Sequence, residues 1–209
     1  MASRSPAARK PSRTGRTRAA LLAAGLDLMV DRPIDAIAID EVVARAGVAK
    51  GSFFNHFVDK HGFASAVAAT VRLEVEAEVA RANAGVADPV ARIAGGMAVA
   101  ARLALEEPRR MTVLLRAQEP TTSQTHPLNR GLKGDVEAAL AAGLLRPEAR
   151  ETGVTYWLGL CLVVIAHVVT TRPSREQAAR HLAEMLLLGL TGLGVPADRA
   201  AQIAREVRI

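Results

Sequence analysis

The sequence of 209 residues predicts an all-α fold, and three observations carry that prediction. Half of the residues are apolar while only 3% are aromatic, and alanine and leucine are abundant. Such a composition favours closely packed helices over sheets. Alternation of apolar and polar residues, which marks a half-buried strand, breaks off within a few residues wherever it starts. Proline, glycine and capping residues recur at helix-length intervals. We therefore expect one large or two small helical domains.

Capping residues and prolines place the boundaries of the longer helices. Thr14 can cap the first helix, which the segment 31–33 ends, and Asp59 can cap the long helix that follows residues 38–57. Residues 120–127 are expected to form a polar loop. The helices predicted in this way span residues 14–31, 59–83, 88–107, 108–119, 128–142, 147–171, 174–193 and 196–207.

Residues 38–63 predict two short helices joined by a tight turn, followed by the start of a third helix. Gly47 is expected to end the first of them, because glycine takes a left-handed backbone without steric cost. Phe53 and Phe57 are expected to form the buried side of the second. Its outward side carries polar groups: Lys50, Ser52, Asn55 and His56. A polar helix after a glycine turn is typical of a helix-turn-helix, whose second helix enters the DNA major groove.

The positive charge of the chain is concentrated at its amino terminus. The formal net charge is +6, and residues 1–18 contain six basic residues and no acidic ones, so the remainder is neutral. A basic arm ahead of a helix-turn-helix suits the DNA phosphate backbone. The alternative is a disordered tail that serves only solubility. The six basic residues are Arg4, Arg9, Lys10, Arg13, Arg16 and Arg18.

Cysteine usage and hydropathy favour a cytoplasmic protein. Cys161 is the sole cysteine, which excludes an intrachain disulfide, and the basic start leads into no apolar segment of the kind a signal peptide needs. The apolar run 156–169 is shorter than a membrane span and is expected to be a buried core helix. No cofactor or metal is expected, because common catalytic and phosphate-binding motifs are absent from the sequence. An enzyme is therefore disfavoured.

Residues 14–63 resemble the amino-terminal domain of the tetracycline-repressor-like (TetR) family of regulators. The resemblance covers about a quarter of the chain, and beyond it only the number and order of the predicted helices are similar to the family. It is carried by Glu41-Val42-Val43, Ala46-Gly47-Val48, Lys50-Gly51-Ser52-Phe53-Phe54-Asn55-His56-Phe57 and Asp59-Lys60.

The resemblance implies a homodimer that binds a palindromic operator and releases it when a small molecule enters the carboxy-terminal domain. It implies a DNA-binding domain over residues 14–62 and a ligand-binding and dimerisation domain over 63–209, while the sequence of residues 1–13 itself predicts a disordered tail. Residues 60–83 and 103–119 are implied to transmit the signal. The implied DNA contacts, with Arg16 added from the basic arm, are Arg16, Lys50, Ser52, Phe54, Asn55, His56 and Lys60.

Three positions depart from the family pattern. The family usually has Thr or Ser where this chain has Ala38, Ser where it has Ala49, and Tyr where it has Phe54. These changes remove two helix caps and several neutral groups that could bind phosphate. We hypothesise that the arginine-rich tail partly offsets this loss.

The implied architecture leads to expectations about the effector, the pocket residues and the dimer residues. An uncharged or mostly apolar effector is expected, because few charged residues fall on the predicted inner faces. The alternative is an effector-independent DNA-binding dimer whose carboxy-terminal domain serves only dimerisation or protein contacts. The predicted pocket residues are Met97, Met111, Leu115, Gln118, Trp157 and His167. The predicted dimer residues are Leu160, Val164, Leu182, Met185, Leu186, Gly189 and Leu193.

Overall fold

The computed structural model describes residues 13–116 and 127–209 and confirms the predicted all-α fold. These residues form ten α-helices and two short 3-10 helices, and they contain no strand. The chain divides into two compact units, residues 1–67 and 68–209. Arg13 begins the first helix, whereas the rest of the predicted tail and most of the predicted loop 120–127 lie outside the described residues.

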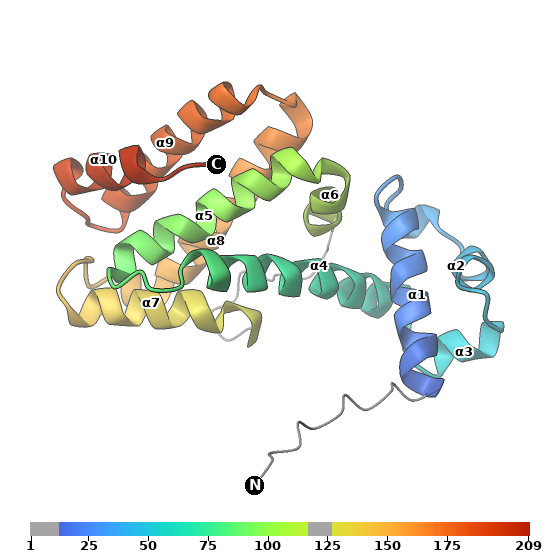
Figure 1. Ribbon diagram of the computed structural model, residues 1–209. Helices are drawn as coiled ribbons and strands as arrows, with labels where there is room; N and C mark the ends of the chain where they lie inside the picture. The colour runs from blue at the N-terminus through green and yellow to red at the C-terminus, as the bar shows by residue number, and fades with distance from the viewer. Residues whose placement is uncertain (1–12, 117–126) are drawn as a thin grey trace, which may run out of the picture. The chain divides into compact units, whose positions relative to one another are not determined.

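The first unit contains α1 (Arg13–Met29), η1 (Ile34–Ala36), α2 (Ile39–Ala46), α3 (Lys50–Phe54) and the start of α4 (Lys60–Ala82) (Figure 1). Helix α1 packs closely on α4 at Gly25, where an added Cβ would lie 2.4 Å from Cζ of Phe63. Buried apolar side chains from every helix fill the interior: Leu21, Ala24, Leu28, Met29, Ile34, Ile37, Val42, Val43, Phe53, Phe57, Phe63, Ala64 and Val67.

The turn between α2 and α3 begins with a left-handed glycine, as predicted. Gly47 ends α2 with φ 65° and ψ 34°, a left-handed conformation that glycine adopts without steric cost. Helix α3 is shorter than predicted, because it ends at Phe54 and Asn55 is its C-cap. Phe57 is buried as expected, but it lies beyond the helix and reaches the core from the following turn.

The second unit continues with α5 (Pro89–Glu106), α6 (Pro108–Arg116), η2 (Pro127–Asn129), α7 (Arg130–Ala141), α8 (Ala149–Thr171), α9 (Arg175–Gly192) and α10 (Ala197–Glu206). Helix α5 packs against α7, α8 and α9, and α10 packs against α9 (Figure 1). The core is built mainly on α5, α8 and α9 and includes Ile93, Met97, Trp157, Leu186 and Leu190.

Predicted helix caps hold the starts of α4, α5 and α9. The Asp59 carboxylate accepts a hydrogen bond from the Gly62 N–H at 2.7 Å, and the Asp88 carboxylate accepts one from the Val90 N–H at 2.9 Å. Ser174 and Gln177 form a reciprocal capping box at α9. Each pair occupies amide donors that a helix start leaves without partners, which explains why these boundaries could be predicted.

Helix α8 is the one described helix that is long and apolar enough to cross a membrane by length and composition. In the structure it packs against α5, α6, α7 and α9. Its buried side carries Trp157, Leu158, Cys161, Val164, Ile165 and Val168. It is therefore a helix of the second unit's core, as its apolar sequence predicted.

Candidate DNA interface and ligand cavity

Helix α3 is anchored by aromatic packing beneath it. The Phe53 ring is fully buried, with ring centroids 5.5 Å from Phe57 and 5.2 Å from Phe63. The next residue, Phe54, contacts the Phe53 ring edge-on, with centroids 5.4 Å apart, but leaves 54% of its surface exposed. The buried Phe53 thus fixes which side of α3 packs on the unit, and Phe54 lies where a partner can reach it.

The predicted DNA-contacting residues lie at or near the outer side of the first unit. Lys50, Ser52 and Phe54 are on α3, whereas Asn55 and His56 occupy the turn after it. Ser52, His56 and Lys60 are half-buried, whereas Lys50, Phe54 and Asn55 are exposed. Arg16 is exposed on α1. The placement is compatible with simultaneous contact to one partner, since all but Arg16 lie on α3 or within six residues of its end.

Several basic groups near α3 already have partners. The Lys50 ammonium lies 2.8 Å from the Asp40 carboxylate, and the Lys60 ammonium donates to the Asp35 carbonyl at 3.2 Å. The Arg18 guanidinium lies over the Phe57 ring, 5.5 Å from its centroid. Exposed ion pairs of this kind contribute at most about 1 kcal/mol. They can therefore exchange partners with phosphate at little cost.

Two of the three residues that depart from the family pattern are N-caps, as the resemblance implied. Ala38 is the N-cap of α2 and Ala49 is the N-cap of α3, and neither start has a side-chain capping bond. Each helix consequently lacks the hydroxyl that could both cap it and contact phosphate.

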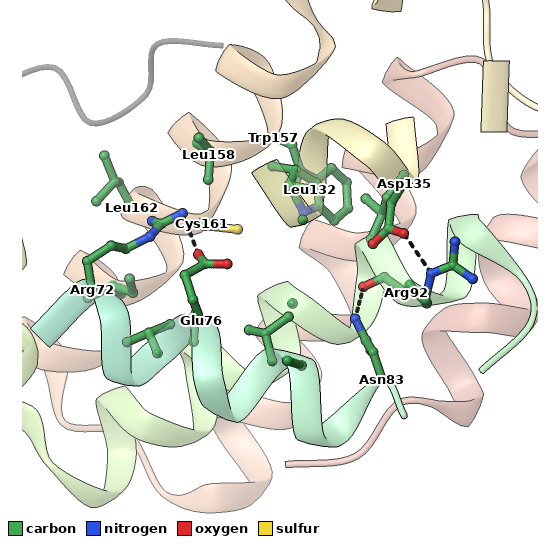
Figure 2. A pocket seen from close by; sticks show the side chains of 18 of the residues that line it. Arg72, Glu76, Asn83, Arg92, Leu132, Asp135, Trp157, Leu158, Cys161 and Leu162 are labelled. Carbon is green, nitrogen blue, oxygen red and sulfur yellow. Dashed lines mark hydrogen bonds and ion pairs between the residues drawn. The ribbon is translucent and has the colours of Figure 1, made fainter. Parts of the chain in front are cut away.

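The second unit encloses a cavity of about 320 Å³ between α4 and the helices α5, α6, α7 and α8 (Figure 2). Most of its walls are aliphatic. They include Val75, Val79, Ile93, Leu114, Leu132, Leu158, Leu162 and Ile165. The volume is within the range of small-molecule sites.

Two ion pairs add polar groups to the cavity wall. Arg72 on α4 lies 2.8 Å from the Glu76 carboxylate, and its guanidinium also donates to Asn129 at 3.0 Å. Arg92 on α5 lies 2.6 Å from the Asp135 carboxylate. Burial raises the pKa of Glu76, and the Arg72 charge partly opposes that rise. Contrary to the sequence-based expectation, charged groups do line the inner faces.

Two buried donors at the cavity have no hydrogen-bond partner within the described residues. One is the indole N–H of Trp157, and the other is the Nε–H of Arg72. A buried donor without an acceptor costs about 1–3 kcal/mol. Both therefore represent unused hydrogen-bonding capacity at this site.

Cys161 lines the same cavity as a buried free thiol. Burial raises its pKa to about 12, and the nearby Arg72 charge lowers the value only in part. Because the thiolate is the reactive form, this cysteine is chemically inert near neutral pH.

The predicted pocket residues divide between several places. Trp157 lines the cavity, whereas Met97 is buried in the core and Met111 borders a separate groove between α4 and α6. Leu115 is half-buried on α6 and is not part of the cavity wall, and Gln118 lies outside the described residues. His167 stacks on His181, with ring centroids 4.0 Å apart.

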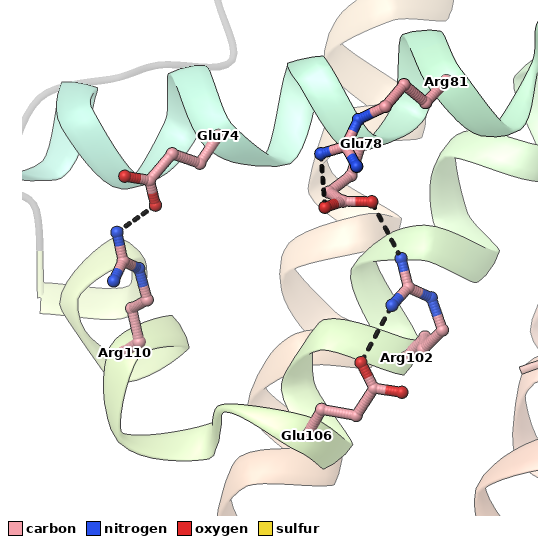
Figure 3. A network of polar contacts seen from close by, with 6 residues as sticks. All are labelled: Glu74, Glu78, Arg81, Arg102, Glu106 and Arg110. Atoms are coloured by element: carbon pink, nitrogen blue, oxygen red, sulfur yellow. Dashed lines mark hydrogen bonds and ion pairs between the residues drawn. The ribbon is translucent and has the colours of Figure 1, made fainter.

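An ion-pair network ties α4 to α5 and α6 on another side of α4 (Figure 3). Glu74 pairs with Arg110 of α6, and Glu78 lies 3.3 Å from Arg102 of α5. Arg102 also lies 2.8 Å from Glu106. These contacts connect the two segments that the resemblance implied as transmission elements.

Most of the predicted dimer residues are already covered within the single chain. Val164, Leu182, Leu186, Gly189 and Leu193 are buried, while Leu160 and Met185 are half-buried. A side chain without exposed surface cannot contribute new area to an interface. The exposed large apolar residues of α8 and α9 are Tyr156, Val163, Leu187 and Leu188. These are the side chains that a partner can reach.

The histidine pair makes stability depend on pH. Burial lowers the pKa of His181 below its ordinary value of 6.5, the charge of His167 lowers it further, and Glu184 opposes the shift. The unfolded chain therefore binds the proton more readily, so the free energy of unfolding should fall as the pH drops below about 6.5. We expect His181→Asn to reduce the loss between pH 7.5 and 5.5 in thermal unfolding. An equal loss in both proteins would contradict this assignment.

The first unit is thus a helix-turn-helix DNA-binding domain, defined by its glycine turn, its anchored α3 and the polar outer side. The family model for bacterial regulatory proteins of the tetR family matches residues 21–67. Over these residues the chain is similar to DNA-binding transcriptional regulators of the tetR family.

Solved structures share the fold over most of the chain. A putative tetR-family regulator from Shewanella sp. PV-4 has a TM-score of 0.72 at 20% identity, over 85% of this chain and 97% of its own. RolR in complex with the ligand resorcinol has a TM-score of 0.66 at 22% identity, over 94% and 97%. An ArpA-like gamma-butyrolactone receptor has a TM-score of 0.55 at 22% identity, over 93% and 98%. No curated protein matches the chain.

Proposed function

We propose that the protein is a cytoplasmic homodimeric repressor that leaves a palindromic operator when a small effector occupies its cavity. The observation that carries this proposal is the combination of a helix-turn-helix unit with a second unit containing a cavity of about 320 Å³. A filled core would have favoured the alternative, an effector-independent dimer. The likeness to RolR with resorcinol and to a gamma-butyrolactone receptor supports effector binding.

Control of DNA binding requires a difference in effector affinity between two states of the dimer. The effector must bind the DNA-incompetent state more tightly, and DNA must weaken effector binding by the same factor. Helix α4 is suited to couple the two events, because it begins in the DNA-binding unit and also lines the cavity. Its ion pairs with Arg102 and Arg110 connect its movement to α5 and α6.

Dimerisation is proposed to use α8 and α9 through their exposed apolar residues. Val163 and Leu188 leave 54% and 67% of their surfaces exposed, although they belong to helices of the core. Complete burial of an exposed leucine or valine side chain stabilises a protein or complex by about 1.5–3 kcal/mol. Symmetric pairing of the two copies would cover this surface.

The DNA-binding proposal is tested by selecting genomic fragments with the purified protein at a stated salt concentration. We expect one palindromic site to be recovered. Asn55→Ala should relax its sequence preference, because asparagine can read an adenine edge. Lys60→Ala should weaken binding evenly across sequences, because a phosphate contact carries no sequence information. Recovery of no preferred site would refute sequence-specific regulation.

The contribution of the basic tail is tested by deleting residues 2–13. We expect weaker operator binding and a shallower dependence of the binding constant on salt, since each lost phosphate contact reduces the slope of log K against log salt by about 0.9. A matched variant that replaces the tail arginines and lysine with glutamine separates charge from length. An unchanged affinity and salt slope would show that the tail serves only solubility.

A further inference from the structure

The polar groups of the cavity restrict the chemistry of the molecule that can occupy it, provided that the proposed effector site is correct. Four charged side chains line the cavity, two of each sign, and they form the Arg72–Glu76 and Arg92–Asp135 pairs (Figure 2). An ionic ligand would bury a charge for which the wall keeps no free counter-charge, and such burial is costly. The cavity therefore favours an uncharged ligand.

The two buried side-chain atoms of cavity-lining residues that lack a hydrogen-bond partner among the described residues are both donors. The Trp157 side chain is 1% exposed, and its indole N–H has no acceptor among the described residues. The Nε–H of Arg72 likewise has no acceptor among the described residues, whereas its Nη2 contacts both Glu76 and Asn129. A ligand that supplies an acceptor oxygen gains these hydrogen bonds without having to break others.

The size of the cavity and its aliphatic walls limit the shape of the ligand that can bind. An apolar cavity of about 150 Å³ can hold benzene, so about 320 Å³ has room for a compact body of one or two rings. Aliphatic side chains from α4, α5, α7 and α8 would surround that body, among them Val79, Ile93, Leu132 and Leu158. They offer contact area but no polar partner.

We propose that the cavity binds an uncharged, compact cyclic molecule carrying a carbonyl oxygen, such as a ketone, lactone or ester, and that the Trp157 indole donates a hydrogen bond to this oxygen. The Arg72 Nε–H supplies a second donor to the same ligand. The proposed ligand is therefore mostly apolar, as expected from the sequence, but it also carries one hydrogen-bond acceptor.

The first experiment uses the wild-type protein and matched probes. Trp157 is the sole tryptophan, so its indole N–H gives one resonance in a proton–nitrogen correlation spectrum. We expect cyclohexanone, 1-indanone or 1-tetralone to bind and move this proton resonance strongly downfield. Cyclohexane, indane and tetralin, which lack the acceptor, should leave it near its original position. Binding of all three ketones without a downfield shift, or of none of them at millimolar concentration, would overturn the proposal.

The second experiment compares affinities in a way that cancels the different water solubilities of ketone and hydrocarbon. The ratio of the ketone Kd to the hydrocarbon Kd should rise roughly tenfold or more in Trp157→Phe, because the variant keeps a ring but loses the donor. An unchanged ratio would contradict the role of Trp157. Indane-1-carboxylate serves as the charged control, and binding as tight as that of 1-indanone would refute the preference for uncharged ligands.

Operator release, measured in parallel on the selected DNA site, separates this inference from the proposed function. Ketones that bind through the indole and never release DNA would support the ligand class and count against effector control. An effector that releases DNA but lacks any acceptor oxygen would support the proposed function and overturn this inference.

Discussion

Phe53→Ala should unfold much of the DNA-binding unit and abolish operator binding. The ring is fully buried, and it contacts both Phe57 and Phe63. Truncating a buried phenylalanine to alanine typically costs about 3–5 kcal/mol. The free energy of unfolding of a small unit is about 5 kcal/mol at the low end of the usual range, so little stability would remain.

The neighbouring Phe54 provides the matched control for this prediction. Phe54→Ala removes an identical ring from a half-exposed position where it contacts Phe53 edge-on, so it should cost about 0.5–1.5 kcal/mol, well below the cost of Phe53→Ala. Any loss of operator affinity in that variant reports on direct contact. Hydrogen exchange of α1 amides measures the stability of this unit separately from the second. Unchanged exchange in Phe53→Ala would refute the proposed anchoring of α3.

Arg72→Met should destabilise the second unit by about 2–3 kcal/mol near neutral pH. This is less than the usual cost of breaking a fully buried ion pair, because both side chains of the Arg72–Glu76 pair retain some exposure. The variant leaves the Glu76 carboxylate without its guanidinium, so the pKa of Glu76 should rise further. Because the folded protein then binds a proton more readily than the unfolded chain, the variant should recover stability as the pH falls towards 5.

Two comparisons make the result specific to the cavity pair. Arg72→Met combined with Glu76→Leu removes both charges and should cost less than Arg72→Met alone. Arg110→Met breaks the more exposed Glu74–Arg110 pair and should cost at most about 1 kcal/mol. Urea denaturation at pH 5 and 8 measures all three variants. An equal loss in Arg72→Met and Arg110→Met would contradict the importance of burial.

Local signals explain the parts of the fold that the sequence predicted. Asp59, Asp88 and Ser174 form caps within a few residues of their own positions, and Gly47 acts through its own backbone angles. Such effects need no knowledge of distant contacts. The end of α3 was misplaced because Phe57 has the spacing of a helical residue, whereas its burial comes from tertiary packing against Phe63.

The cavity illustrates what local signals cannot provide. Arg72 and Glu76 are separated by four residues on a helix with many charges, which is the usual pattern of a solvated face. Only tertiary packing turns this pair inward while Glu74 and Arg81 stay exposed. The predicted dimer residues likewise lie on an apolar stripe, and such a stripe alone does not distinguish a chain's own core from a surface that a partner covers.

The buried thiol of Cys161 makes this protein convenient for site-directed labelling. With a pKa of about 12, the native cysteine should react very slowly with maleimides at neutral pH. A cysteine introduced at an exposed position such as Val58, four residues after the end of α3, could then carry a fluorophore without removal of the native residue. The distance between two such labels in a dimer would report directly on the separation of the two DNA-binding units.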